Sequence, residues 1–303
     1  MTEGGLVVIG AGIAGMSAAI WCERLRIPLT WLEGSSVLGG QLLRINGAIP
    51  DYPGLEAENG REFLKKLVVH LGNLQLAPQL NSEVVKVEPA RRLLTLRNGH
   101  CFRPDAVLLA SGASPRRLEI PGEEDFRGVG VSDSATRDRH VFAGRAVAVV
   151  GGGDAALENA LILAECCPQV FLVHRGTTFR GQSHFQAAVL THPRIKVLWE
   201  SQVCRILGAE QVQGIELAGP EGRSEISVGG VVVKVGVAAN VGPWKGQLQL
   251  DDWGYIHVDA SQRTSAHGVW AAGDVCNPKA SSLVAAAGQA MVAVKSIASA
   301  GVL

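Results

Sequence analysis

The sequence predicts an α/β protein built from two Rossmann-like dinucleotide-binding domains. The chain of 303 residues exceeds the usual size of one domain. One pattern, an apolar β-rich run followed by a glycine cluster and then by helix-forming residues, occurs twice: LVVIGAGIAGMSAAIW over 6–21 and AVAVVGGGDAALENALIL over 146–163. A strand that runs through glycines into a helix is typical of the first turn of a dinucleotide-binding unit.

Composition excludes several function classes. Twenty-eight basic and 28 acidic residues leave no net charge, which argues against nucleic acid and anionic membranes as partners. We expect no membrane span, because Lys295 interrupts the longest apolar stretch. The N-terminus carries no basic region and leads directly into a strand, so we expect a cytoplasmic protein. The six scattered cysteines lack metal-ligand spacing, and no metal site is expected.

Each glycine of the two turns has a physical task. Gly10, Gly12 and Gly15 form G-x-G-x-x-G, whereas the second turn, from Gly151 to Ala156, reads G-x-G-x-x-A. The first glycine permits the tight turn, the second lets a pyrophosphate approach the backbone, and the third position allows close helix packing. The N-terminus of the following helix would then bind the phosphates. One copy alone could be a purely structural turn.

The strand that follows each turn distinguishes the two ligands. LTWLEG reaches Glu33 and VFLVHRG reaches His174, each 23 residues after the first glycine of its turn. A carboxylate such as Glu33 accepts hydrogen bonds from ribose hydroxyls, which suits FAD or NAD. His174, Arg175 and Arg180 offer cations for a 2′-phosphate, which favours NADPH, with NADH possible. Alternatively, the two arginines are a solvated surface pair.

A third segment supports the first site. GVWAAGDV, residues 268–275, predicts a strand that ends at Gly273 and Asp274, and an alanine-rich helix follows from about Ser281. An aspartate at this end of a strand can reach the ribityl or pyrophosphate side of a flavin. Asp274 could also be an ordinary turn residue.

Nearly the whole chain resembles the low-molecular-weight thioredoxin reductase family. The resemblance rests on GAGIAG, GGQL, PDYPG, ASGAS, GGGDAA, HRGTTFR and AAGDV. It implies three-layer ββα domains, with an FAD domain made of residues 1–114 and 246–303 and an NAD(P)H domain, 115–245, inserted between them. It also implies a homodimer. In lacking a dithiol, the chain resembles ferredoxin or flavodoxin NADP reductases.

The resemblance also assigns cofactor residues. It implies that FAD contacts Gly10, Gly12, Ile13, Ala14, Glu33, Gly40, Gln41, Leu42, Asp51, Gly112, Gly273, Asp274, Ser282 and Leu283. It implies that NADPH contacts Gly153, Asp154, Ala155, His174, Arg175 and Arg180.

Three departures from the family pattern limit this transfer. The two redox-active cysteines of the family fall on Ser134 and Arg137, although Asp138 matches the acid beside the dithiol. Gly176 occupies the place of the second arginine after the histidine. An arginine-glutamine pair at the flavin-facing turn is replaced by Ser281 and Ser282.

Without two thiols a dithiol relay is impossible in this loop. We therefore expect an FAD-dependent NAD(P)H oxidoreductase that passes electrons from the flavin directly to an unknown acceptor, for which a small redox protein is one candidate. Two alternatives are a flavoprotein that is reduced by another protein and a non-catalytic FAD-binding protein. The weak catalytic candidates are Ser134, Arg137 and Asp138; Arg137 could bind an acidic partner or stabilise reduced flavin. The same loop could also have drifted without a chemical role.

Overall fold

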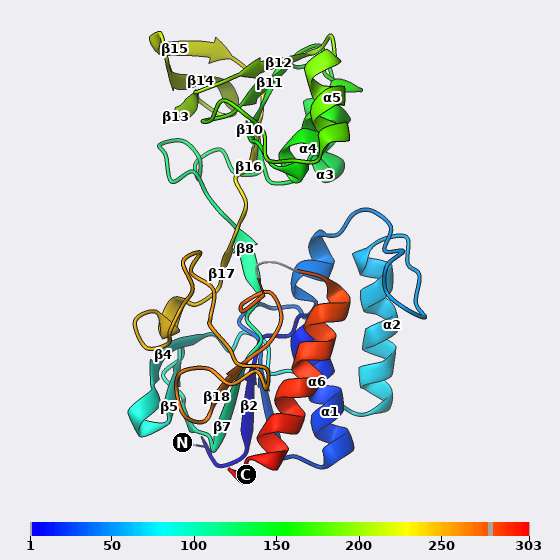
Figure 1. The fold of residues 1–303 in the computed structure, drawn as a ribbon, viewed down its shortest axis with the longest axis vertical. Helices are drawn as coiled ribbons and strands as arrows, with labels where there is room; N and C mark the ends of the chain where they lie inside the picture. Colours follow the sequence, from blue (N-terminus) through cyan, green and yellow to red (C-terminus); the bar gives the residue numbers. More distant parts are fainter. Residues whose placement is uncertain (1, 278–280, 303) are drawn as a thin grey trace. The chain divides into compact units, whose positions relative to one another are not determined.

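The computed structural model describes residues 2–277 and 281–302 and divides into two compact units (Figure 1). The first unit comprises Met1–Ser114 and Ala238–Leu303, and the second comprises Pro115–Val237. The α/β fold with two Rossmann-like units, the second inserted into the first, is thereby confirmed.

The first unit contains a parallel sheet in the order β18-β7-β2-β3 and a second sheet in the order β1-β6-β5-β4. The parallel strands are β2 (Leu6–Ile9), β3 (Leu29–Leu32), β7 (Ala106–Leu109) and β18 (Val269–Ala271). The second sheet consists of β1 (Thr2–Glu3), β4 (Val84–Glu88), β5 (Leu93–Leu96) and β6 (Cys101–Arg103). The helices of this unit are α1 (Ile13–Leu25), α2 (Gly60–Asn73) and α6 (Leu283–Ser299), with short 3₁₀ helices η1 (Gly40–Arg44), η2 (Pro89–Arg91) and η3 (Gly242–Trp244).

The period-2 alternation of strand side chains builds a separate core on each face of the parallel sheet. Leu6 and Val8 of β2 are fully buried on the helix side, among residues of α1 and α6. Val7, one position between them, points to the other face and packs with Val84 and Leu94 of the second sheet. These three layers are the ββα arrangement implied by the family resemblance.

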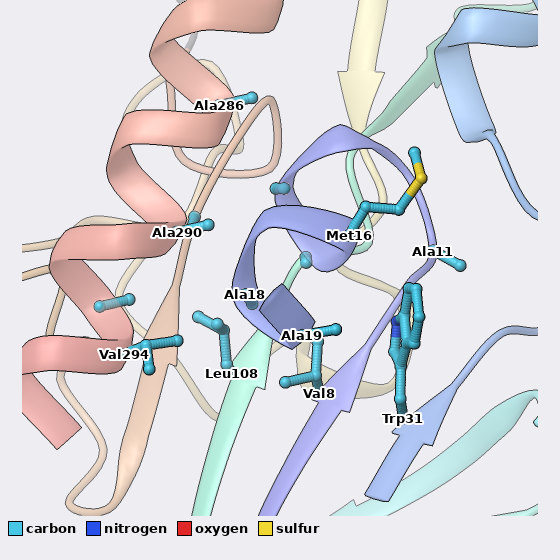
Figure 2. Packing of buried hydrophobic residues seen from close by; sticks show 14 of the residues in the cluster. Val8, Ala11, Met16, Ala18, Ala19, Trp31, Leu108, Ala286, Ala290 and Val294 are labelled. Atoms are coloured by element: carbon cyan, nitrogen blue, oxygen red, sulfur yellow. The ribbon is translucent and has the colours of Figure 1, made fainter. Parts of the chain in front are cut away.

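Small side chains let α1 and α6 lie side by side above the sheet. Ala18 and Ala19 of α1 and Ala290 and Val294 of α6 are all fully buried in the same cluster (Figure 2). Alanine adds little bulk at these positions, so both helix backbones can approach the strands closely. The glycine turn that precedes α1 is held in place by this packing.

The second unit repeats the plan. Its parallel sheet has the order β12-β11-β10-β16-β9, with strands β9 (Val131–Ser132), β10 (Val147–Gly151), β11 (Val170–Val173), β12 (Ile195–Leu198) and β16 (Val231–Lys234). Val147 and Val149 pack toward helices α3 (Ala135–Phe142), α4 (Asp154–Ala164) and α5 (Ser183–Thr191). Ala148 and Val150 pack toward an antiparallel sheet of β13 (Gln202–Gly208), β14 (Val212–Gly219) and β15 (Gly222–Ser227).

The segments that join the units pair with each other, as β8 (Ala113–Pro115) and β17 (Val237–Ala239). The chain re-enters the first unit at Ala238, eight residues before the expected position 246. The reason is visible in η3: Trp244 is only 4% exposed and lies in the core between the two sheets of the first unit. Residues 238–245 therefore belong to that unit.

Among the described residues, no helix combines the length and the apolar character that crossing a membrane would require.

Candidate functional site

The first glycine turn has no room for side chains at two of its three glycines. Gly10 has a φ of +110°, and a Cβ atom there would lie 2.3 Å from the carbonyl oxygen of Ala110. At Gly15 a Cβ atom would lie 1.9 Å from the carbonyl oxygen of Gly10. Trp31 adds to this contact, because its indole nitrogen donates a hydrogen bond of 2.9 Å to the same carbonyl. The turn and α1 are thus locked against each other.

Gly12 differs, because open space faces it. The nearest heavy atom to a Cβ added at Gly12 would be the Cα of Gly40, 4.0 Å away. Gly12 caps α1 without a side-chain hydrogen bond, and the first turn of the helix, from Ile13 and Ala14, contains no acidic residue. Free N–H groups and the positive end of the helix dipole therefore face a cradle that a Cβ atom would fill. A diphosphate fits such a cradle.

Glu33 lies beside this cradle, as the sequence predicts. Its Oε2 accepts a hydrogen bond of 2.7 Å from the N–H of Ala11, and its Oε1 accepts two of 2.8 Å from the N–H and hydroxyl of Ser35. The carboxylate is thereby fixed at the end of β3, next to the glycine turn. This is the place where a ribose would follow a diphosphate bound at α1.

Two further predicted segments meet the same turn. A Cβ atom at Gly40, where φ is +52°, would lie 3.0 Å from the Cα of Gly12, and the side chain of Gln41 donates a hydrogen bond to the carbonyl of Ala113. Gly273 has a φ of +83° and lies against Ala14, since an added Cβ would be 3.0 Å from the Cβ of Ala14. Segments that are far apart in the sequence thus meet at one helix N-terminus.

The other predicted FAD residues vary in their surroundings. Leu42 is almost fully buried, and Gly112 accepts a hydrogen bond of 2.9 Å from the N–H of Asn240. Ser282 caps α6, since its hydroxyl accepts a hydrogen bond of 3.1 Å from the N–H of Ala285, and Leu283 begins that helix. Asp51 is exposed, and no hydrogen bond joins its side chain to another described residue.

Burial changes the acid-base behaviour of two side chains after β18. It raises the pKa of the Asp274 carboxyl, and a hydrogen bond with Ser281 offsets part of this rise. It also raises the pKa of the Cys276 thiol to about 12, with a smaller contribution from the negative charge of Asp274. Cys276 is therefore a thiol at neutral pH and a poor nucleophile.

The second glycine turn repeats the constraints of the first. Gly151 has a φ of +151°, and a Cβ atom there would lie 2.3 Å from the carbonyl of Lys234 and 2.8 Å from the Cβ of Ala156. Gly153 caps α4, and a Cβ atom added to it would meet no heavy atom within 4 Å. Unlike α1, helix α4 has an acidic residue, Asp154, in its first turn. The carboxylate of Asp154 accepts a hydrogen bond of 2.6 Å from the N–H of Gln182.

His174 and the two predicted arginines have separate roles in the geometry. The His174 ring is 8% exposed, lies between Phe179 and Gly152, and forms a 2.9 Å hydrogen bond with the carbonyl of Thr178. Arg175 and Arg180 are exposed, and neither has a carboxylate partner among the described residues. The N–H of Arg180 donates a hydrogen bond of 2.9 Å to the carbonyl of Gly152, which fixes this arginine beside the turn.

At the position that the family resemblance assigns to the dithiol, Arg137 is held by two carboxylates. Its guanidinium forms a bidentate pair with Asp138, at 2.8 and 2.7 Å, and a 2.8 Å ion pair with Asp133. Ser132 donates a 2.5 Å hydrogen bond to Asp138 and accepts one of 2.9 Å from the N–H of Ser134. We call Ser132, Asp133, Ser134, Arg137 and Asp138 the loop network.

The network fixes the ionisation of Asp138. Burial alone would raise its pKa, but hydrogen bonds from Arg137 and Ser132 outweigh burial and lower it. The same contacts with Asp138 and Asp133 raise the pKa of Arg137. Asp138 is therefore a carboxylate at neutral pH and cannot serve as the proton donor that an acid beside a dithiol would provide. Both charges of the predicted catalytic candidates are already neutralised within the chain.

The structure adds two polar residues that the sequence interpretation missed. Lys234 ends β16 in register with Gly151, and burial lowers the pKa of its ammonium group, although the carboxylates of Asp133 and Glu158 act in the opposite direction. Asn159 lies on α4 and is only 5% exposed. In the sequence, Lys234 could have been noticed as the single lysine in the apolar run VVVKVG. Asn159 gives no comparable signal, because it is an asparagine inside a predicted helix.

The remaining cysteines provide no substitute dithiol close to either turn. Cys166 and Cys167 are adjacent, with 3.9 Å between their sulfur atoms, at the end of α4 that lies away from Gly153. Burial, with a smaller contribution from Cys166, raises the pKa of Cys167 to about 12. Within the described ranges, no group of three or more histidine, cysteine, aspartate or glutamate side chains could hold a metal ion.

Comparison with known proteins agrees with this arrangement. A family model described as pyridine nucleotide-disulphide oxidoreductase matches residues 5–293. The chain is 32% identical to thioredoxin reductase of Streptomyces coelicolor, over 93% of this chain and 89% of that protein. It is 29% identical to a 34.2 kDa protein in the rubredoxin operon of Clostridium pasteurianum, over 89% of this chain and 88% of that protein.

A solved structure shows the same similarity in three dimensions. The crystal structure of Lactococcus lactis thioredoxin reductase in its FR conformation superimposes with a TM-score of 0.82 at 29% sequence identity, covering 97% of each chain.

The different surroundings of Gly12 and Gly15 predict opposite effects of the same substitution. Gly12 has φ −77° and ψ −172°, which alanine adopts freely, so Gly12→Ala should leave the stability of the FAD-free protein within about 1 kcal/mol of the parent. Its added methyl group should nevertheless weaken dinucleotide binding at least tenfold. Gly15→Ala forces backbone atoms apart and should lower the free energy of unfolding by roughly 1–3 kcal/mol or more. Urea denaturation measures the stability of each variant, and FAD titration measures its affinity for the dinucleotide. An equal loss of stability in the two FAD-free variants would contradict this interpretation.

The loop network predicts a pH-dependent contribution to stability. Because the folded-state pKa of Asp138 is lowered, its contribution is complete above the unfolded value of about 3.9 and is lost as pH falls through the folded value. Arg137→Ala should therefore destabilise the protein by about 1 kcal/mol near pH 7, after allowance for solvent exposure, and this difference should vanish in acid. Urea denaturation at a series of pH values measures it. Arg139→Ala, which removes an exposed pair with Glu165, is the control and should have almost no effect. A difference that persists at pH values below the folded pKa of Asp138 would count against the network.

Proposed function

The chain belongs to the pyridine nucleotide-disulphide oxidoreductase family, among its FAD-dependent, thioredoxin reductase-like members, and we propose that it takes hydride from NADPH and passes electrons from FAD directly to an external acceptor. Under this proposal the first unit binds FAD and the second binds the nicotinamide nucleotide. A cytoplasmic homodimer, as expected from the sequence and the resemblance, is part of the same proposal.

FAD fits the first unit because one helix N-terminus meets every group needed to hold its diphosphate and ribose. Gly12 and Gly40 leave the backbone of α1 accessible, and Glu33 is already oriented as an acceptor for ribose hydroxyls. Gly273 lies against Ala14 at the same helix end, and Asp274 follows it in the chain. Burial raises the pKa of the Asp274 carboxyl. A ligand bound beside this carboxyl would therefore change how readily it ionises.

NADPH fits the second unit through Gly153 and the two exposed arginines. The diphosphate would meet the free N–H groups at the start of α4, while Arg180, fixed beside Gly152, and Arg175 would pair with the 2′-phosphate. His174, which the resemblance also assigns to NADPH, would contribute to this site from a buried position. Its ring lies against Gly152 and forms a hydrogen bond with the carbonyl of Thr178, so it would orient the segment that carries the two arginines.

One feature supports the proposal of direct electron transfer: the loop network lies at the positions that the family resemblance assigns to the dithiol. Disulfide reduction needs a thiolate attacker and a resolving thiol. Ser134 and Arg137 supply neither, and Asp138 is held as a carboxylate by its hydrogen bonds. Bound FAD would itself accept the hydride and release electrons to the acceptor. The chain would contribute binding, orientation and fixed charge, and the acceptor is a small redox protein or a small molecule.

The nucleotide preference gives the direct test. NADPH should reduce the bound flavin at a lower concentration than NADH, because only NADPH offers a 2′-phosphate to Arg175 and Arg180. Replacing both arginines by alanine should lower the ratio of the half-saturating concentration of NADH to that of NADPH by about tenfold, equivalent to roughly 1.4 kcal/mol. Arg205→Ala, an exposed arginine on β13, is the matched control and should leave the ratio unchanged. Anaerobic flavin bleaching provides the measurement.

Three results would redirect the assignment. Equal reduction by both nucleotides in the parent would contradict the phosphate role of the arginines. No reduction by either nucleotide would favour a flavoprotein reduced by another protein. A protein that cannot be loaded with FAD would overturn the proposed function as a whole.

A further inference from the structure

A buried amide joins the two functional segments of the second unit. Asn159, one turn into α4, donates a 2.7 Å hydrogen bond from Nδ2 to the carbonyl of Ala155, in the first turn of the same helix. Its Oδ1 accepts a 2.8 Å hydrogen bond from the N–H of Ala135, the first residue of α3. Both ends of this amide are therefore satisfied, and the two bonds define its orientation.

The two ends of this bridge lie at two different sites, the proposed nucleotide site and the loop network. Ala155 lies in the turn of α4 whose N–H groups would bind the nucleotide diphosphate. Ala135 follows Ser134, which caps α3 by accepting a hydrogen bond of 3.3 Å from the N–H of Arg137. The bridge thus runs from the nucleotide end of α4 to the start of the loop network.

Because the bridge is buried, breaking either of its hydrogen bonds is costly. Asn159 is 5% exposed and Ala135 is fully buried, so water cannot readily replace a lost partner of the Ala135 N–H. The N–H groups at the start of a helix have no partner within the helix, and here a side chain of another helix satisfies one of them. A displacement of the first turn of α4 would therefore carry the start of α3 with it or break a buried hydrogen bond.

We propose that Asn159 is a positioning residue that couples the nucleotide-binding end of α4 to the loop network at the start of α3. A nucleotide that fixes the first turn of α4 then also restricts the segment that replaces the dithiol. This inference rests on the proposed nucleotide site and adds a route of communication within the second unit.

Hydrogen exchange followed by mass spectrometry, with and without saturating NADP⁺, tests the coupling in the FAD-loaded protein. In the parent, NADP⁺ should slow exchange across residues 132–138 by at least threefold. Asn159→Ala should reduce that nucleotide-dependent change to less than half, whatever it does to the exchange rate without nucleotide. A purely structural role would alter only the rate without nucleotide.

Two further variants keep the test decisive. Asn159→Asp retains an oxygen for Ala135 but sets a carboxylate against the Ala155 carbonyl, so it should also reduce the response if Asn159→Ala folds poorly. Leu161→Ala weakens the packing of the same helix without touching the bridge and should preserve the response. An undiminished response in a folded Asn159 variant overturns the coupling while leaving the nucleotide site intact. Absence of NADP⁺ binding by the parent, measured by calorimetry, overturns the nucleotide site and the coupling together.

Discussion

The close approach of a helix to its preceding strand is the constraint on which both units depend. In the first unit the carbonyl of Gly10 leaves no space for a Cβ atom at Gly15, and in the second a Cβ atom at Gly151 would lie 2.8 Å from the Cβ of Ala156 in α4. A Cβ atom does not fit at Gly10, Gly15 or Gly151, and the resulting geometry leaves the N-termini of α1 and α4 free to bind anions. Closely packed alanines of α1 and α6 maintain the same approach in the first unit.

The loop network carries neutralised charges at the positions that the family resemblance assigns to a dithiol. A pair of thiols requires a nearby proton donor and access to a substrate disulfide, whereas the loop network saturates Arg137 with two carboxylates and keeps Asp138 ionised. An arginine neutralised in this way is a weaker site for an acidic partner than its sequence position suggests. The loop is better understood as a charged support at the start of α3, and Asn159 connects that support to the nucleotide end of α4.

The sequence predicted the parts of the molecule that follow from backbone periodicity and from glycine spacing. Both turns, the strand that ends at Glu33 and the discontinuous first unit follow from these patterns and from the family resemblance. The return at Ala238 differs from the expected 246 because the burial of Trp244 depends on a core contact that no local pattern encodes. Asn159 was missed for a related reason, because its bond with Ala135 depends on the packing of α3 on α4. The ion pairs of Arg137 with Asp133 and Asp138 are local, and they depend on the turn at the start of α3. The position of the His174 ring against Gly152 likewise depends on burial, which spacing in the sequence does not show.

An anaerobic reductive titration tests most directly the central claim that the flavin is the only redox centre. The FAD-loaded protein is titrated with dithionite, and flavin absorbance is followed against the reducing equivalents added. If electrons pass directly from the flavin, complete bleaching should require two electrons per FAD. A requirement for four electrons per FAD, which falls to two after the cysteines have been reduced and then alkylated, would reveal a disulfide in exchange with the flavin and would contradict the account.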